Sequence, residues 1–234
     1  LFFGMLGMHG EYAANMAAHE TDLLISLGAR FDDRVTGRLD EFASKAKVIH
    51  IDIDPTSIAK LVVADYPIVG DLKLTVQAMI EDAENYEIND FSNWVELLKD
   101  YREKEPLRYI DTDDLIKPQW PIQRVGKILG DNAIISTDVG QHQMWTAQFF
   151  PFSHPRQWIT SGGLGTMGFG LPAALGAARA FKGTNRVVVN FTGDGSILMN
   201  IQELMTCSEY ELPVINIVLN NNYLGMVRQW QTMF

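Results

Sequence analysis

Two polar clusters near the end of the sequence each follow an apolar, strand-like run. Asp194 lies in a Gly-Asp-Gly-Ser segment after residues 187–191, and Asn221 lies in a run of three asparagines after residues 214–219. Residues 200–211 between them have apolar side chains at helical spacing, so the segment predicts a parallel strand–helix–strand crossover. Both clusters then lie at the carboxyl edge of one sheet. A carboxylate and an amide oxygen there suit a hard divalent cation that completes its shell with phosphate oxygens.

This pair resembles the diphosphate-anchoring motif of thiamin diphosphate enzymes. Taken alone, a Gly-Asp-Gly segment is more often a simple turn, and a run of asparagines is more often a polar loop. The distance between the two clusters, with a strand-like run before each of them, favours the metal site over both alternatives.

Two further segments could contact a phosphorylated ligand. Residues 163–168 have the spacing G-x-G-x-x-G, but a poor strand precedes them at 157–160 and no acid follows about 20 residues on, so we reject a nicotinamide cofactor. These glycines either let the backbone approach a ligand or serve only the packing of a helix expected at 169–181. Gln141 and His142 follow a buried strand and precede a helix, where they can hold phosphate oxygens. A structural role is the alternative for His142.

Composition bounds the remaining possibilities. The chain has 234 residues and 47% hydrophobic content, enough for one large or two ordinary domains with a proper core. Its net charge of −10, with no basic block, argues against a nucleic-acid partner. The single cysteine, Cys207, cannot form an internal disulfide and indicates a reducing compartment. No apolar run approaches the roughly 18 residues of a membrane span, and we expect no membrane partner.

Short strands alternate with helices over residues 1–85. The expected strands are 23–27, 48–51 and 67–69, and the expected helices are 11–19 and 72–83. This alternation predicts a parallel, doubly wound sheet with its ligands beyond the carboxyl ends of the strands.

Residues 86–117 are the most polar part and predict a linker with one amphipathic helix around Trp94 and Tyr101. A second domain is expected over 118–234, with Pro121 at a helix start. Its expected elements before the crossover are a helix at 121–129, a strand at 133–137, a loop at 138–142 and a helix at 143–150. The chain begins at Leu1 and ends at Phe234 within a helical pattern. We therefore expect an α/β fragment with two doubly wound parallel-sheet domains, both incomplete.

Five segments together resemble the catalytic large subunits of the acetohydroxyacid synthase family, also called acetolactate synthases. They are GARFDDRVTG (28–37), HIDIDPTSI (50–58), DVGQHQMW (138–145), SGGLGTMG (161–168) and LGMVRQWQ (224–231). The resemblance runs through both domains. It implies that residues 1–85 are the latter part of an FAD-binding middle domain and that 118–234 are a C-terminally truncated diphosphate-binding domain. The pyrimidine-binding domain that precedes them in the family is absent.

The resemblance also implies cofactor contacts. The side chains of Asp194 and Asn221 and the main-chain carbonyl of Tyr223 are implied to ligate Mg²⁺, and Gln141 and His142 to contact the diphosphate. Further implied contacts to thiamin diphosphate are Gly165, Met167, Gly193, Gly195 and Ser196. The implied contacts to FAD are His9, Gly10, Gly28, Arg30, Asp52, Asp54 and Asp71.

Four residues are implied to act in the reaction itself. Met167 resembles the apolar residue that holds the cofactor in its bent conformation. Arg34 resembles the guanidinium that receives the carboxylate of the second 2-oxo acid, a bidentate task that suits arginine. Met226 and Trp230, together with Val227, resemble the wall of a substrate channel. Without the resemblance, such a triplet is more often core than pocket.

The implied reaction decarboxylates pyruvate on thiamin diphosphate and joins the two-carbon unit to pyruvate or 2-oxobutyrate. This is the first common step of branched-chain amino acid biosynthesis, toward isoleucine and valine. The family's general acid is a glutamate outside this sequence, contributed across a dimer interface, and FAD is structural. A homodimer or homotetramer with a small regulatory subunit is implied. The expected location is the cytoplasm in a bacterium, or an organelle if a targeting segment precedes this sequence.

Two alternatives stay open. The first is another thiamin diphosphate enzyme, such as a pyruvate oxidase, a glyoxylate carboligase or the flavin-free catabolic acetolactate synthase, and a flavin spectrum would discriminate the last of these. The second is a cofactor-binding module that catalyses nothing by itself.

Overall fold

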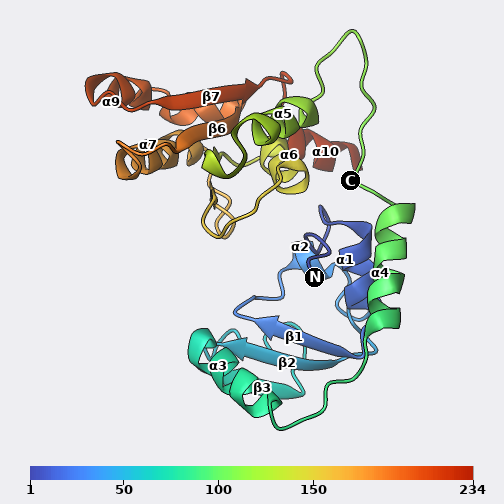
Figure 1. Cartoon of the computed structure of the whole chain (residues 1–234). Helices are drawn as coiled ribbons and strands as arrows, with labels where there is room; N and C mark the ends of the chain where they lie inside the picture. The colour runs from blue at the N-terminus through green and yellow to red at the C-terminus, as the bar shows by residue number, and fades with distance from the viewer. Residues whose placement is uncertain (234) are drawn as a thin grey trace. The chain divides into compact units, whose positions relative to one another are not determined.

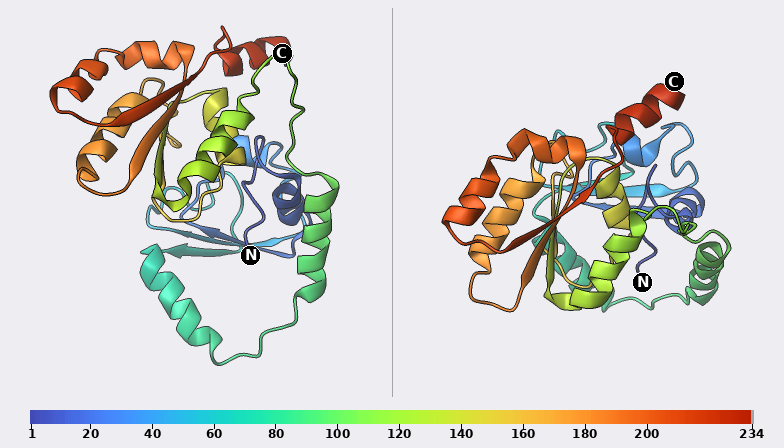
Figure 2. Two further views of the ribbon diagram at one scale, coloured as in Figure 1. Left: turned by 45° about the horizontal axis from the view of Figure 1, so that its top comes forward. Right: turned by 90° about the horizontal axis from the view of Figure 1, so that it is seen from above.

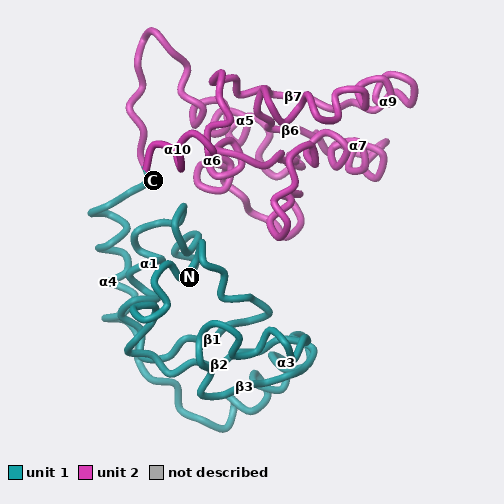
Figure 3. Tube along the Cα trace, turned by 180° about the vertical axis from the view of Figure 1, so that it is seen from behind, with its two compact units in different colours: residues 1–107 teal, residues 108–234 magenta. Residues whose placement is uncertain are grey.

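The computed structural model describes residues 1–233, which divide into two compact units at the bond between Leu107 and Arg108. Figure 3 colours the two units separately. The division falls inside the segment expected to be a linker. None of the helices in residues 1–233 combines the length and the apolar character needed to cross a membrane.

The first unit is built on a three-stranded parallel sheet in the order β1-β2-β3 (Figure 1). Its elements are α1 (Tyr12–Glu20), β1 (Leu23–Leu27), α2 (Asp33–Thr36), β2 (Lys47–Asp52), β3 (Tyr66–Val69), α3 (Leu72–Ala83) and α4 (Ser92–Lys104). Helix α4 packs on α1. The Tyr101 hydroxyl of α4 donates to a Glu20 carboxylate oxygen at 3.0 Å, and the Tyr101 ring contacts the Tyr12 ring edge to face. The amphipathic helix expected inside the linker is therefore part of the first unit.

The second unit contains a four-stranded parallel sheet in the order β5-β4-β6-β7. Its strands are β4 (Ala133–Thr137), β5 (Trp158–Thr160), β6 (Val187–Gly193) and β7 (Val214–Leu219). Its helices are α5 (Gln119–Leu129), α6 (Gln141–Phe149), α7 (Gly170–Ala180), α8 (Asp194–Ile197), α9 (Glu203–Glu209) and α10 (Gly225–Met233), with short 3₁₀ turns at Gly130–Asn132 and Leu198–Asn200.

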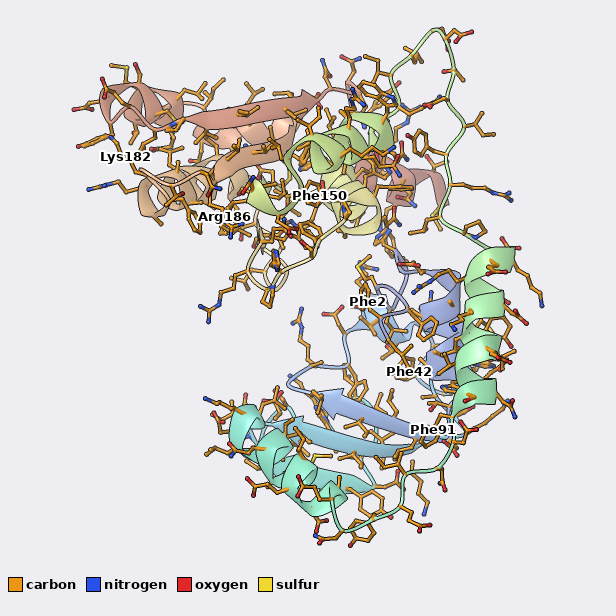
Figure 4. The ribbon with its side chains drawn as sticks, viewed as in Figure 1. Phe2, Phe42, Phe91, Phe150, Lys182 and Arg186 are labelled. Carbon is orange, nitrogen blue, oxygen red and sulfur yellow. The ribbon has the colours of Figure 1, made fainter. Side chains whose placement is uncertain are left out.

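Helices cover both faces of this sheet, as the view from above in Figure 2 shows. Ile134 and Val188 point to one face and pack with α7 and Leu212. The alternate positions, including Val189 and Phe191, point to the other face and pack with α5 and with Phe150, which Figure 4 labels. This alternation explains why β4 and β6 are apolar on both sides, and it confirms the doubly wound parallel sheet.

Several boundaries differ from the sequence-based expectation. The segment 157–160 was expected to be a poor strand, but Trp158–Thr160 forms β5 and pairs with Ile135–Thr137. The loop expected at 138–142 is shorter, because α6 already begins at Gln141. The helix expected at 200–211 is shorter, because Asn200 ends a 3₁₀ turn and α9 covers only the seven residues Glu203–Glu209. Pro121 is the third residue of α5, which begins at Gln119.

Strand β6 lies inside the second unit, and the apolar side chains packed on it should contribute most to the stability of that unit. Phe191 is fully buried, so Phe191→Ala should lower the free energy of unfolding by about 3–5 kcal/mol, through lost burial and the cavity left behind. Ile128→Ala on α5 is the control, because Ile128 is 65% exposed and should change stability by less than about 0.5 kcal/mol. Denaturant unfolding measures both, and equal effects would contradict this packing.

Candidate functional site

A pocket of about 250 Å³ lies in the second unit beyond the carboxyl ends of β4, β6 and β7. Its walls come from four places: the start of α6, the glycine-rich segment, the β6–α8 junction and the β7–α10 connection. The residues of the pocket that the sequence had singled out are Gln141, His142, Gly165, Met167, Gly193, Asp194, Gly195, Ser196, Asn221, Tyr223, Met226 and Val227. The structure therefore brings together residues that are up to 86 positions apart, from Gln141 to Val227.

The register between β6 and β7 explains why the two polar clusters meet. Gly193 at the end of β6 is paired with Leu219 at the end of β7. Asp194 is the next residue after β6, and Asn221 follows β7 by two positions. Parallel pairing thus delivers the acid and the amide to the same edge of the sheet, as the spacing in the sequence indicated.

Asn221 is held in place by bonds to its own loop and to α6. Its side-chain oxygen accepts from the backbone N–H of Tyr223 at 3.1 Å, and its amide nitrogen donates to Gln141 Oε1 at 3.2 Å. A Cβ at Gly225 would collide with the same Gln141 side chain. A side chain at this position would displace the end of Gln141 from its bond with Asn221.

These residues fit a metal-bound diphosphate. Asp194, Asn221 and the carbonyl of Tyr223 offer hard oxygen donors on one side of the pocket. In residues 1–233 no three His, Cys, Asp or Glu side chains gather into a cluster that could hold a metal by themselves. A cation here would thus depend on oxygens from a bound ligand, as Mg²⁺ bound with phosphate does. The first turn of α6 lies at the same pocket and favours negative charge.

His142 is 6% exposed and lies in that first turn. Burial lowers the pKa of the imidazole to about 4, although the nearby Asp138 and Asp194 and a bond to the Asp138 main-chain carbonyl act in the opposite direction. Its Nε2 has no hydrogen-bond partner among the described residues. The ring is therefore neutral at pH 7, and one of its buried polar atoms is left for a ligand.

Two of the expected reaction residues lie elsewhere. Trp230 is one turn beyond Met226 on α10 and is not among the residues that line this pocket. Arg34 belongs to the first unit, where it lines a separate cavity of about 490 Å³ together with Met8 and residues of α1.

The residues expected to contact FAD also lie in the first unit. Asp52 ends β2 and Gly28 follows β1, and the N–H of Gly28 donates to the Ile51 carbonyl at 2.8 Å. Asp54 follows β2 by two positions, and Asp71 caps α3 through its bond from the Leu74 N–H. These four residues gather at the carboxyl edge of the three-stranded sheet. Of the other three, Arg30 pairs with Asp32 at 2.6 Å, and His9 and Gly10 precede α1.

Some residues at the pocket were not singled out from the sequence. Trp145 and Leu224 line it, and Asp138, fully buried at the end of β4, bonds to the glycine-rich segment. Trp145 could have been found, because it lies four residues after Gln141 and so on the same face of α6. Asp138 gives no such signal, since its role depends on which segment folds over it.

Comparisons with known protein families agree with this geometry. Residues 138–234 match the family described as thiamine pyrophosphate enzyme, C-terminal TPP binding domain. Residues 1–79 match the thiamine pyrophosphate enzyme central domain. The chain belongs to the thiamine pyrophosphate enzymes. The match to the C-terminal TPP binding domain includes all the residues that line the pocket at the carboxyl edge.

Individual relatives are similar along nearly the whole chain. The acetolactate synthase isozyme 3 large subunit of Escherichia coli is 50% identical over 98% of this chain and 40% of its own length. Acetolactate synthase 2, chloroplastic, of Brassica napus is 52% identical over 98% of this chain and 36% of its own length. The acetolactate synthase large subunit of Haemophilus influenzae is 48% identical over 99% of this chain and 41% of its own length. The chain thus spans about two fifths of these relatives.

The depressed pKa of His142 makes a testable prediction. An NMR titration of the ligand-free protein should place the midpoint of the His142 ring near pH 4. The unfolded chain binds this proton near pH 6.5, so stability is lost as the pH falls from about 6.5 to 4, by up to about 3 kcal/mol. His142→Gln should remove that part of the pH dependence, whereas His19→Gln on the exposed end of α1 should keep it. A midpoint near 6.5 for His142 would contradict the burial argument.

Proposed function

We propose that this chain is part of an acetolactate synthase catalytic large subunit. The reaction would decarboxylate pyruvate and join the two-carbon unit to pyruvate or 2-oxobutyrate, the first common step of branched-chain amino acid biosynthesis. The observation that carries the proposal is the pocket in which Asp194, Asn221, Gln141, His142 and Met167 meet. Relatives named acetolactate synthase, about half identical over nearly the whole chain, support this choice within the family.

We infer that Asp194, Asn221 and the Tyr223 carbonyl hold Mg²⁺, and that the cation holds the diphosphate. Asp194 offsets part of the cation's charge, and Asn221 is oriented for the task by Gln141 and the Tyr223 N–H. Thiamin diphosphate, when bound, supplies the stabilised carbanion that the reaction needs. Ser196 and His142 contribute polar atoms at the diphosphate side of the pocket.

The apolar part of the same pocket has a different task. Met167 and Met226 line it, so they exclude water and present polarizable surface to the non-phosphate part of the cofactor. Such surface holds a ring system in one conformation without competing hydrogen bonds. Met167 is the residue that we assign to keeping the cofactor bent.

FAD and the acceptor substrate are assigned to the first unit. Gly28, Asp52, Asp54 and Asp71 at one sheet edge suit a dinucleotide, since ligands of such sheets bind beyond the carboxyl ends of the strands. His9, Gly10 and Arg30 complete this assignment. Arg34, which lines a cavity, is assigned to the carboxylate of the second 2-oxo acid.

The assembly and the location are also proposals. We infer a homodimer or homotetramer of large subunits, with 2-oxo acids as substrates and a small regulatory subunit as partner. The location would be bacterial cytoplasm or an organelle, since the similar proteins include bacterial and chloroplastic ones.

The metal assignment predicts the effect of Asp194→Ala in the complete enzyme. The diphosphate would lose the cation that bridges it to the protein, so retention of thiamin diphosphate should fall roughly 100-fold or more. Asn221→Ala removes a neutral ligand and should weaken retention less, by about tenfold. Asp131→Ala, an exposed acid of the same unit paired with His154, is the control. Cofactor titrations followed by fluorescence decide this, and unchanged retention in Asp194→Ala would refute the assignment.

The pocket composition predicts that residues 1–234 alone form no acetolactate. Its described lining contains no glutamate, so no general acid of the expected type faces the cofactor. The purified chain should bind the cofactor with Mg²⁺ but give no product from pyruvate above a protein-free control. Turnover by the chain alone would show that the general acid lies within it.

The two proposed substrate contacts should affect products differently. The acceptors 2-oxobutyrate and pyruvate differ by one methylene, which an apolar wall discriminates by roughly 10- to 200-fold. We assign Trp230, one turn beyond Met226 on α10 and outside the pocket lining, to the apolar wall that meets the acceptor in the complete enzyme. Trp230→Leu in the complete enzyme should therefore lower the preference for 2-oxobutyrate while sparing total product. Arg34→Ala should depress both products, because both acceptors carry the carboxylate. A competition assay with both acids measures this, and an unchanged product ratio in Trp230→Leu would remove Trp230 from this role.

A further inference from the structure

The glycine-rich segment that carries Met167 is held by three polar side chains, two from β4 and its carboxyl end and one from the 3₁₀ turn after α8. Asp138 Oδ1, at the end of β4, accepts from the N–H of Gly168 at 2.6 Å. Asn200 Nδ2, in the 3₁₀ turn after α8, donates to the Gly168 carbonyl at 2.7 Å. Ser136 Oγ on β4 donates to the Gly170 carbonyl at 2.8 Å. Both the backbone N–H and the backbone carbonyl of Gly168 are therefore bonded by side chains.

The hydrogen bond from the Gly168 N–H to Asp138 lies in the buried interior of the second unit. Asp138 is 0% exposed, and its second oxygen accepts from the Thr192 hydroxyl at 3.1 Å. Ser136, Asn190 and Thr192 on the same sheet face are also fully buried. A buried donor that loses its acceptor is costly, and water cannot easily replace a partner in a closed site. The bond between Asp138 and Gly168 is thus a strong local restraint.

The backbone around this bond leaves no room for a side chain at Gly168 or Gly170. Gly168 has a φ of +87°, and a Cβ there would lie 2.7 Å from Asn200 Nδ2. A Cβ at Gly170 would lie 2.6 Å from the backbone nitrogen of Asp138. The turn can approach the sheet closely only because both residues are glycines. Met167 lies directly before this turn and lines the pocket.

The same two residues are also connected to other parts of the pocket wall. The Asp138 main-chain carbonyl accepts from the His142 ring, and Asn200 lies in the turn that follows α8, the helix that Asp194 begins. Asp138 and Asn200 therefore connect the Met167 turn to the two segments assigned to the diphosphate and its cation.

We propose that Asp138 and Asn200 are positioning residues, which clamp the backbone of Gly168 on both sides and thereby fix Met167 against the cofactor pocket. The inference rests on the proposed function for the identity of the ligand, but the clamp itself is a property of this chain. Neither residue lines the pocket, so both act through Met167 rather than by touching a ligand.

The first test reads the clamp without ligand or activity. In the complete protein, hydrogen exchange of peptides covering residues 161–169 should become about tenfold faster or more in Asp138→Ala and in Asn200→Ala. Asp138→Asn keeps an oxygen for the Gly168 N–H and an amide that the Thr192 hydroxyl can accept from, so it should stay within about threefold of the unchanged protein. Gln157→Ala is the matched control, since Gln157 is buried and anchors the 153–157 loop by bonds to Ser153 and Gly130. It should leave 161–169 unchanged.

The second test separates positioning from binding. At saturating thiamin diphosphate and Mg²⁺, kcat should fall about tenfold or more in Asp138→Ala and Asn200→Ala, whereas the cofactor Kd should change by less than about threefold. Asp138→Asn should recover most of kcat. If the Asp138→Ala variant does not fold, the Asn200→Ala variant tests the inference by itself, because Asn200 is only half-buried.

Three results would overturn the inference: unchanged exchange at 161–169, a loss of cofactor affinity as large as the loss of kcat, or the same kcat loss in Gln157→Ala. Failure of the proposed function is distinct from these. It would appear if the protein without substitutions bound no thiamin diphosphate. The comparison of hydrogen exchange between the variants would still test the clamp in that case.

Discussion

The parallel pairing of β6 with its two neighbours is the constraint on which the second unit depends. It aligns Thr137 with Phe191, and Gly193 with Leu219, so the loops that follow β4, β6 and β7 begin at the same edge. Pairing on both sides also explains why the interior of β6 is fully buried, which gives this edge a rigid base. A ligand that needs several loops at once can be held only where strands end together.

The face of the sheet toward α7 changes character along its strands. Ile134 and Val188 are apolar and pack under the helix, whereas Ser136, Asn190 and Thr192 nearer the edge are polar and fully buried. Buried polar groups are stable only when they are bonded. Ser136 Oγ donates to the Gly170 carbonyl, Thr192 Oγ1 donates to Asp138 Oδ2, and Asn190 Nδ2 donates to Asn216 Oδ1. The apolar core is thus continuous with the buried polar side chains that support the pocket.

The sequence predicted the elements whose signal is local. Strands 133–137 and 214–219 and helix 72–83 have the bounds expected for them, because apolar runs and flanking turn residues define their ends. The position of Asp194 and Asn221 in the wall of the same pocket was predictable from the strand–helix–strand crossover. Strand β5 was missed because it has only three residues and its bonds come from β4 alone. The early start of α6 follows Gly140, which has a φ of +153° and where a Cβ would lie 2.8 Å from the His142 ring. The bond from Gly168 to Asp138, 30 residues away, carries no local pattern at all.

We propose that Asp194 and Asn221 hold a cation together at this edge, and one measurement tests this proposal most directly. A crystal structure of the complete protein with thiamin diphosphate and Mn²⁺ in place of Mg²⁺ would locate the cation by its anomalous scattering. One peak should lie within about 2.5 Å of an Asp194 carboxylate oxygen, Asn221 Oδ1 and the Tyr223 carbonyl. A peak that is bound without Asp194, or a diphosphate held away from this edge, would contradict it.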